Sequence, residues 1–139
     1  MSLYRFSETS LNRREGVDPR LIEISDFAIQ ITPVDFGIPK DGGIRTASRQ
    51  YDLYLAGKSK ADGTTHQSAH QSGKALDFYA WVNGHASWEV GHLAMVAAAH
   101  LQAASMLGYS LKWGGFFKPF SDEPFYHGWD CAHVELVES

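Results

Sequence analysis

Two pairs of histidine and aspartate residues are the part of the sequence best suited to chemistry. His70 and Asp77 stand on either side of Gly73, and Asp130 and His133 stand near the C-terminus. Imidazole nitrogens and carboxylate oxygens are good zinc ligands, and a turn at Gly73 would let His70 and Asp77 converge. With His133 they make three ligands and leave a fourth position open for water, which is typical of a catalytic zinc site. Asp130 is then a spare carboxylate and a candidate general base.

Each of these assignments has an alternative in the sequence. Two histidines and one carboxylate also suit iron, manganese or cobalt, so the ligands do not by themselves select zinc. Asp130 could orient a ligand histidine instead of moving a proton. His66 lies close before His70 and could replace it, and His127 could replace His133 in the same way. We predict a single zinc ion, with His66 and His127 as residues of flexible loops or gates.

The predicted ligands need rigid elements to hold them. The apolar run at residues 75–82 predicts one buried strand, which would support Asp77 more firmly than a loop would. Residues 133–137 predict a second strand that closes the sheet. The polar segment 57–68 is long enough for a functional loop over the site, and Asn83-Gly84 predicts a hairpin turn.

Helical periodicity and capping residues predict the rest of the fold. Ser7, Asp18 and Ser87 are expected N-caps, and Pro33 and Gly108 are expected helix ends. The predicted helices cover residues 7–14, 19–32, 47–56 and 88–107, and further short strands cover 34–38 and 111–113. We predict a single α+β domain over residues 1–139, with helices packed on a mainly antiparallel sheet and the zinc site at the sheet centre.

Length, charge and composition bound the class of protein. The 139 residues carry a formal net charge of −4, with 44% hydrophobic and 20% charged residues, as is ordinary for a soluble globular protein. The charge argues against a nucleic-acid-binding protein, which usually shows a basic patch. No apolar run reaches the roughly 20 residues of a membrane span, so we expect no membrane insertion.

The N-terminus lacks the basic and apolar regions of a signal peptide, so we expect synthesis in the cytoplasm. The single cysteine, Cys131, excludes an internal disulfide and fits a reducing compartment. We expect its thiol to be buried, and we expect the chain to be a monomer.

Taken together, the motifs resemble those of the zinc D-Ala-D-Ala carboxypeptidase and dipeptidase family, which shares its fold with the hedgehog signalling domain. The resemblance rests on the Ser, His, Gly, Ala and Asp of residues 68–77 and on Asp-x2-His-x-Glu-Leu at residues 130–136. Within the family, the phage L-alanyl-D-glutamate endopeptidase endolysins are the most similar. They share the features of residues 32–36, of residues 43–46 with Gln50 downstream, and of Trp113-Gly114-Gly115. The resemblance covers nearly the whole chain.

The resemblance implies roles for individual residues. His70, Asp77 and His133 would be the zinc ligands, and Asp130 the catalytic acid and base. Arg45 would bind substrate near the scissile bond, either at the oxyanion or at a substrate carboxylate. The other predicted substrate-binding residues are Gln50, Ser68 and Trp113.

The resemblance also implies a function. We expect hydrolysis of the bond between L-alanine and D-glutamate in the peptidoglycan stem peptide, by a phage or prophage endolysin that acts in the periplasm or cell wall after release. One alternative is a D-Ala-D-Ala carboxypeptidase or dipeptidase, and another is a zinc-containing module that binds peptidoglycan without hydrolysing it. Ala69, Lys74 and Val134 depart from residues that are common in the family, which bears on substrate preference more than on catalysis.

Overall fold

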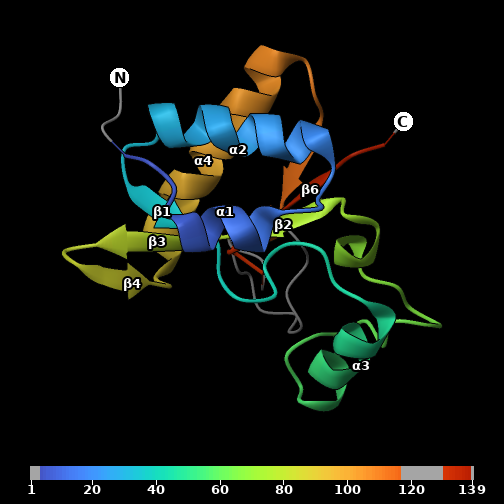
Figure 1. The fold of residues 1–139 in the computed structure, drawn as a ribbon. Helices are drawn as coiled ribbons and strands as arrows, with labels where there is room; N and C mark the ends of the chain where they lie inside the picture. Colours follow the sequence, from blue (N-terminus) through green and yellow to red (C-terminus); the bar gives the residue numbers. More distant parts are fainter. Residues whose placement is uncertain (1–3, 117–129, 139) are drawn as a thin grey trace.

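The computed structural model describes residues 4–116 and 130–138, which form one mixed α+β domain (Figure 1). The described elements are α1 (Glu8–Arg14), α2 (Pro19–Ile31), β1 (Asp35–Gly37), α3 (Ala47–Leu55), η1 (Ala69–Ser72), β2 (Ala75–Asp77), β3 (Tyr79–Val82), β4 (His85–Ser87), α4 (Val90–Leu107), β5 (Leu111–Trp113), η2 (Gly114–Phe116) and β6 (His133–Leu136), where η denotes a 3-10 helix. The predicted fold class is confirmed.

The strands form two small antiparallel sheets. One has the order β1-β3-β4 and the other has the order β2-β6-β5. The turn at Asn83-Gly84 joins β3 to β4, and both of its residues have the positive φ that such a tight hairpin requires. Figure 1 shows this hairpin projecting at one side of the molecule and α3 at the other.

The prediction of one continuous strand over residues 75–82 is wrong. Phe78 interrupts it, because β2 pairs with β6 whereas β3 pairs with β1. The Phe78 amide donates a hydrogen bond to the carbonyl of Ala132 at 2.9 Å, and the Phe78 side chain is fully buried. An apolar run cannot reveal this break, because periodicity does not say which strand will pair with each half. Asp77 therefore ends an edge strand, and His133 begins the middle strand beside it.

Side-chain caps explain where three of the helices begin. In α1, α2 and α3 a side-chain oxygen accepts a hydrogen bond from an amide of the first turn, and the capping residues are Ser7, Asp18 and Thr46. Ser87 does not cap α4 as predicted. It ends β4 instead, and α4 begins after Glu89 without a side-chain cap. Gly108, with φ of 81°, ends α4 as predicted.

Helices α2 and α4 pack against each other and close the core over the sheets. Leu21 and Ile24 of α2 and Val96 of α4 are fully buried there. Helix α4 is long and apolar enough to cross a membrane by length and composition alone. A helix in a protein core meets the same criterion, and the packing of α4 on α2 places it there.

Candidate metal centre

Three elements bring the predicted ligands together. His70 lies on η1, Asp77 is the last residue of β2, and His133 is the first residue of β6, directly opposite Asp77 in the ladder. Ser68 begins η1, because its Oγ accepts a hydrogen bond from the His70 amide at 3.2 Å. Gly73 ends η1 with φ of 72°, a conformation that favours glycine. The local sequence therefore turns the chain so that His70 faces Asp77.

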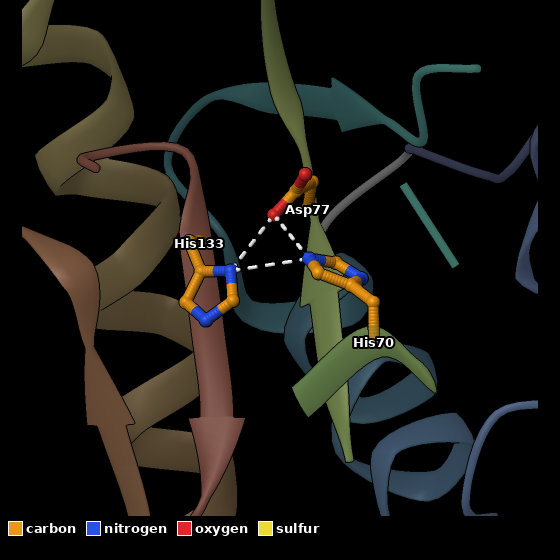
Figure 2. A group of neighbouring side chains, drawn as sticks. All are labelled: His70, Asp77 and His133. Carbon is orange, nitrogen blue, oxygen red and sulfur yellow. Dashed lines mark hydrogen bonds and ion pairs between the residues drawn. The ribbon is translucent and has the colours of Figure 1, made fainter. Parts of the chain in front are cut away.

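The three side chains point at a common centre (Figure 2). Nε2 of His70 lies 3.2 Å from Oδ1 of Asp77 and 3.2 Å from Nδ1 of His133, and this Nδ1 lies 3.0 Å from the same Oδ1. Ligand atoms around a tetrahedral zinc ion stand roughly 3.3 Å apart, given bond lengths of about 2.0–2.1 Å. Within residues 4–116 and 130–138, these three residues form the group of potential metal ligands. Its spacing fits one divalent ion.

A second hydrogen bond orients each ligand histidine. Nδ1 of His70 lies 2.8 Å from the carbonyl oxygen of Gly43, and Nε2 of His133 lies 2.8 Å from Oε1 of Glu135. Both oxygens can only accept, so these ring nitrogens carry the protons when the imidazoles are neutral. The lone pairs then lie on Nε2 of His70 and Nδ1 of His133, which are the two nitrogens that face the centre.

Arg45 orients the third ligand. Its Nη2 donates to Oδ2 of Asp77 at 3.1 Å, so that Oδ1 is left to face the two histidines. The same guanidinium donates through Nε to the carbonyl of Asp41 at 2.8 Å and through Nη1 to Oε1 of Gln50 at 3.1 Å. Arg45 is thus held at three points beside the centre.

Gln50 connects Arg45 to the loop at residues 57–68. Its side chain is fully buried, and its amide nitrogen donates to Oγ of Ser59 at 2.7 Å and to the carbonyl of Ala61 at 2.8 Å. The carbonyl of the same amide accepts from Arg45. Gln50 therefore helps to hold Arg45 in place, and its side-chain oxygen and nitrogen both have hydrogen-bond partners.

A cleft of about 530 Å³ opens beside the centre. Its walls include Ser59, Lys60 and Ala61 from the loop on one side and Asp130, His133 and Glu135 on the other. The loop therefore forms one wall of the cleft beside the site, and its predicted role as a functional loop stays a prediction. Ser68 also lines the cleft, while its hydroxyl caps η1.

Asp130 lies at the open side of the centre. Its Oδ2 is 3.7 Å from Nδ1 of His133, and its side chain is 37% exposed whereas that of His133 is 7% exposed. Partial burial raises the pKa of the Asp130 carboxyl above its usual range. A carboxyl in this position can exchange a proton with water in the cleft.

The charges of the cluster favour a bound cation. Burial alone would raise the pKa of Asp77, but the two imidazoles outweigh burial and hold this pKa well below its usual range. Burial also opposes a charge on His133, yet the carboxylates of Asp77, Glu135 and Asp130 outweigh it and raise the pKa of His133 to about 10. A site that holds a proton on a buried imidazole this firmly has an excess of negative charge, which a divalent cation would offset.

Trp113 lies behind the site rather than on the wall of the cleft. Its side chain is buried, and its indole N–H donates to the carbonyl of Cys131 at 2.7 Å. Gly114 packs so closely on the backbone of Asp130 that a side chain there would clash. The Trp113-Gly114 pair thus supports the segment that carries Asp130. The thiol of Cys131 is buried, as predicted.

Of the two alternative ligands, His66 alone lies within the residues that the structure describes. His66 is exposed on the loop and does not join the ligand group. His127 lies outside the described residues. Sequence reasoning assigned no role to Glu135 or Gly43. Glu135 could have been found, because residues two apart on a strand share a face, whereas Gly43 lies 27 residues before His70 and no local pattern links the two.

Comparisons with known proteins identify the family of the chain. The family model described as phage L-alanyl-D-glutamate peptidase matches residues 1–137. The L-alanyl-D-glutamate peptidase of Escherichia phage T5 is 30% identical over 141 aligned positions, which cover 96% of this chain and 98% of that protein. The crystal structure of the Serratia marcescens L-Ala D-Glu endopeptidase ChiX matches with a TM-score of 0.79 and 29% identity, over 98% of this chain and 91% of that one. The chain therefore belongs to the phage L-alanyl-D-glutamate peptidase family, as its motifs predicted.

Proposed function

We propose that the protein is a zinc-dependent peptidoglycan peptidase that hydrolyses the bond between L-alanine and D-glutamate of the stem peptide. The observation that carries this proposal is the oriented group of His70, Asp77 and His133, which opens toward Asp130 and the cleft. The names of the family and of its relatives point to the same bond. Residues 1–139 would form a single catalytic domain.

His70, Asp77 and His133 would hold the ion through Nε2, Oδ1 and Nδ1. When bound, zinc supplies a Lewis acid that polarises a peptide carbonyl and makes water more acidic. The chain contributes the orientation of the ligands, because Gly43 and Glu135 keep the lone pairs of the two histidines toward the centre.

Asp130 would move the proton. Its Oδ2 would accept a proton from water as the water oxygen bonds to the carbonyl carbon of L-alanine. The same oxygen would then donate that proton to the amine nitrogen of D-glutamate as the C–N bond breaks. The raised pKa of Asp130 suits this exchange, because a carboxyl whose pKa lies closer to neutral pH can both accept and donate a proton.

Arg45 would bind substrate with the donors that the fold leaves available. A guanidinium carries five N–H donors, and three of them are directed to Asp77, Asp41 and Gln50. The remaining donors can stabilise the developing oxyanion or pair with a substrate carboxylate. Ser68 would contact the substrate from the cleft wall, whereas Gln50 and Trp113 would act indirectly by positioning Arg45 and the Asp130 segment.

The family also bears on where the protein would work. A phage or prophage endolysin would be made in the cytoplasm and would reach the cell wall after release. Its partner there would be the peptidoglycan stem peptide, and the protein would act as a monomer.

Mass spectrometry of purified peptidoglycan digested with the protein tests this function. We expect fragments that end in lactyl-L-alanine, matched by peptides that begin at D-glutamate. Both should disappear with a chelator and return when zinc is added back. Loss of D-alanine alone would identify a D-Ala-D-Ala carboxypeptidase instead, and binding without cleavage would identify a zinc-containing binding module.

A further inference from the structure

A second cavity lies on the outer face of the β1-β3-β4 sheet, and its lining includes none of the three predicted ligands. It has a volume of about 260 Å³, and its lining includes Arg5, Ser7, Asp35, Gly37, Tyr79 and Trp81. Strand pairing places Asp35 beside Trp81 and Gly37 beside Tyr79. We call these six residues the sheet-face cavity.

The rings of Tyr79 and Trp81 line the sheet-face cavity, and that of Trp88 lies beside Tyr79. The Tyr79 ring lies 6.5 Å from that of Trp81 and 6.1 Å from that of Trp88, and the two tryptophans are 45% and 55% exposed. Gly37 makes room for Tyr79, because a methyl group at this position would lie 2.5 Å from the Tyr79 hydroxyl oxygen. Clustered exposed aromatic side chains with a polar rim are typical of a binding surface.

The polar groups of the cavity have no side-chain partner in residues 4–116 and 130–138. Asp35 accepts a hydrogen bond from the Phe36 amide at 2.8 Å, and burial raises the pKa of its carboxyl. Within the same residues, the guanidinium of Arg5 and the hydroxyl of Tyr79 make no hydrogen bond or ion pair. Two donor groups, the Arg5 guanidinium and the Tyr79 hydroxyl, and one acceptor group, the Asp35 carboxyl, therefore remain available to a ligand.

This combination fits a neutral sugar ring better than a charged ligand. The C–H face of a sugar can pack on an aromatic ring while its hydroxyl and acetamido groups bond to polar side chains. An anion would be repelled by Asp35 and a cation by Arg5, whereas a neutral ring can bond to both. The cavity lies just below the 300–1,000 Å³ typical of drug-sized ligands, so it suits one ring rather than a chain.

The sheet-face cavity lies within reach of the metal centre. Tyr79 follows Asp77 by two residues, so their Cα atoms are at most about 7 Å apart. Every second residue from Leu76 to Ala80 is fully buried, which leaves Asp77, Tyr79 and Trp81 on the side of the chain that faces away from the core. In peptidoglycan a lactyl group joins the muramic acid to the L-alanine whose carbonyl is attacked. The sugar thus stands roughly two residue lengths, also about 7 Å, from the scissile bond.

We propose that the sheet-face cavity is a subsite for one N-acetylated sugar ring of the glycan strand, on the L-alanine side of the scissile bond. The proposal rests on the proposed peptidase function, which supplies the substrate. The enzyme would then recognise the sugar and the peptide together.

Two substrates with the same stem peptide test the proposal, one carrying N-acetylmuramic acid and the other an acetyl group at its N-terminus. We expect wild type to cleave the sugar-bearing substrate with the higher kcat/KM. Trp81→Ala should lower kcat/KM for that substrate on the order of tenfold and change it less than about twofold for the acetyl peptide. Met106→Ala removes a side chain that is 60% exposed on α4 and should change neither value.

A binding measurement separates the subsite from the peptidase activity. The peptide-free disaccharide of N-acetylglucosamine and N-acetylmuramic acid should shift the amide resonances of β1 and β3 in wild type but not in Trp81→Ala. Asp35→Asn, which keeps the side-chain shape, should weaken binding several-fold in a folded protein. Equal cleavage of both substrates without such shifts would overturn the subsite and leave the peptidase function intact. If neither substrate is cleaved, the peptidase function fails and the disaccharide titration alone decides on the subsite.

Discussion

Buried histidines occupy two contrasting regions of this molecule. Beneath the β1-β3-β4 sheet, His100 of α4 is fully buried, with its ring centroid 4.8 Å from that of Phe36 and 5.1 Å from that of Phe78. Its Nδ1 donates to a backbone carbonyl of its own helix, while within the described ranges Nε2 has no hydrogen-bond partner. At the candidate metal centre, His70 of η1 and His133 of β6 each have polar partners at both ring nitrogens.

The contrast shows that the side chains around a buried histidine, and not its burial, decide whether it is a packing residue or a candidate metal ligand. Burial lowers the pKa of His100 to about 4, so its neutral ring packs as an aromatic side chain. His133 is also buried, but its carboxylate neighbours raise its pKa to about 10. A histidine side chain is therefore a neutral packing group in one region and a positively charged group in the other.

Removing a ligand of the metal centre should have the largest effect, because it removes the polar partners that distinguish His133 from His100. Asp77→Ala deletes both a ligand oxygen and the carboxylate that lies 3.0 Å from Nδ1 of His133. We expect zinc content to fall to background by atomic absorption and cleavage of peptidoglycan to fall below detection. His66→Ala, on the adjacent loop, should retain both. Zinc retention in Asp77→Ala, or zinc loss in His66→Ala, would move the metal site away from the predicted ligands.

Asp130→Asn should have the next largest effect. The substitution keeps the shape of the side chain but removes its ability to accept a proton, so we expect kcat to fall by about 100- to 10,000-fold with one zinc per chain retained. Stopped-time cleavage assays and metal analysis of the same sample check both parts. An unchanged kcat would exclude Asp130 as the acid and base, and loss of zinc would assign it to orienting His133.

His100 should give stability a pH dependence of its own. The pKa of His100 is about 4 in the folded chain, whereas an unperturbed histidine has a pKa of 6.5. The unfolded chain therefore binds more protons than the folded chain between these two pH values. The stabilisation from a neutral His100 is present above about pH 6.5 and is lost as pH falls toward 4, by about 3 kcal/mol at most. The free energy of unfolding of wild type, measured in urea, should therefore fall relative to that of His100→Leu as pH falls from 6.5 to 4. Parallel curves would contradict this account, and His85→Gln, at an exposed histidine, serves as the control.

Glu135→Gln should have the smallest effect of the four. It keeps a hydrogen-bond acceptor for Nε2 of His133 but removes the charge, so we expect zinc affinity to fall by about 10- to 100-fold. Competition with a fluorescent chelator measures the change. Lys112→Gln alters the other neighbour of the same carboxylate, which lies 3.4 Å away, and should leave zinc affinity nearly unchanged. Equal effects of the two substitutions would refute the orienting role of Glu135.

Local patterns were enough to predict most helices and the convergence of the ligands. Ser7, Asp18 and Gly108 mark helix ends because capping depends on neighbouring residues. The turn at Gly73 and the two motifs led to the prediction that His70, Asp77 and His133 converge, and the structure brings them together. That they bind zinc stays a prediction.

Features that depend on residues distant in the sequence could not be predicted from local sequence patterns. The break at Phe78 arises because the two halves of one apolar run pair with different strands. The hydrogen bond from His70 to Gly43 and the engagement of Gln50 on both sides depend on the folded loops. Periodicity and propensity contain no information about such contacts.

Anomalous X-ray diffraction at the zinc edge, from crystals grown with zinc, tests the central claim most directly. The account predicts one strong peak about 2.0–2.1 Å from Nε2 of His70, Nδ1 of His133 and Oδ1 of Asp77. Asp130 should lie beside the peak without coordinating it. Absence of a peak there, or a peak coordinated by His66 or His127 in place of these ligands, would contradict it.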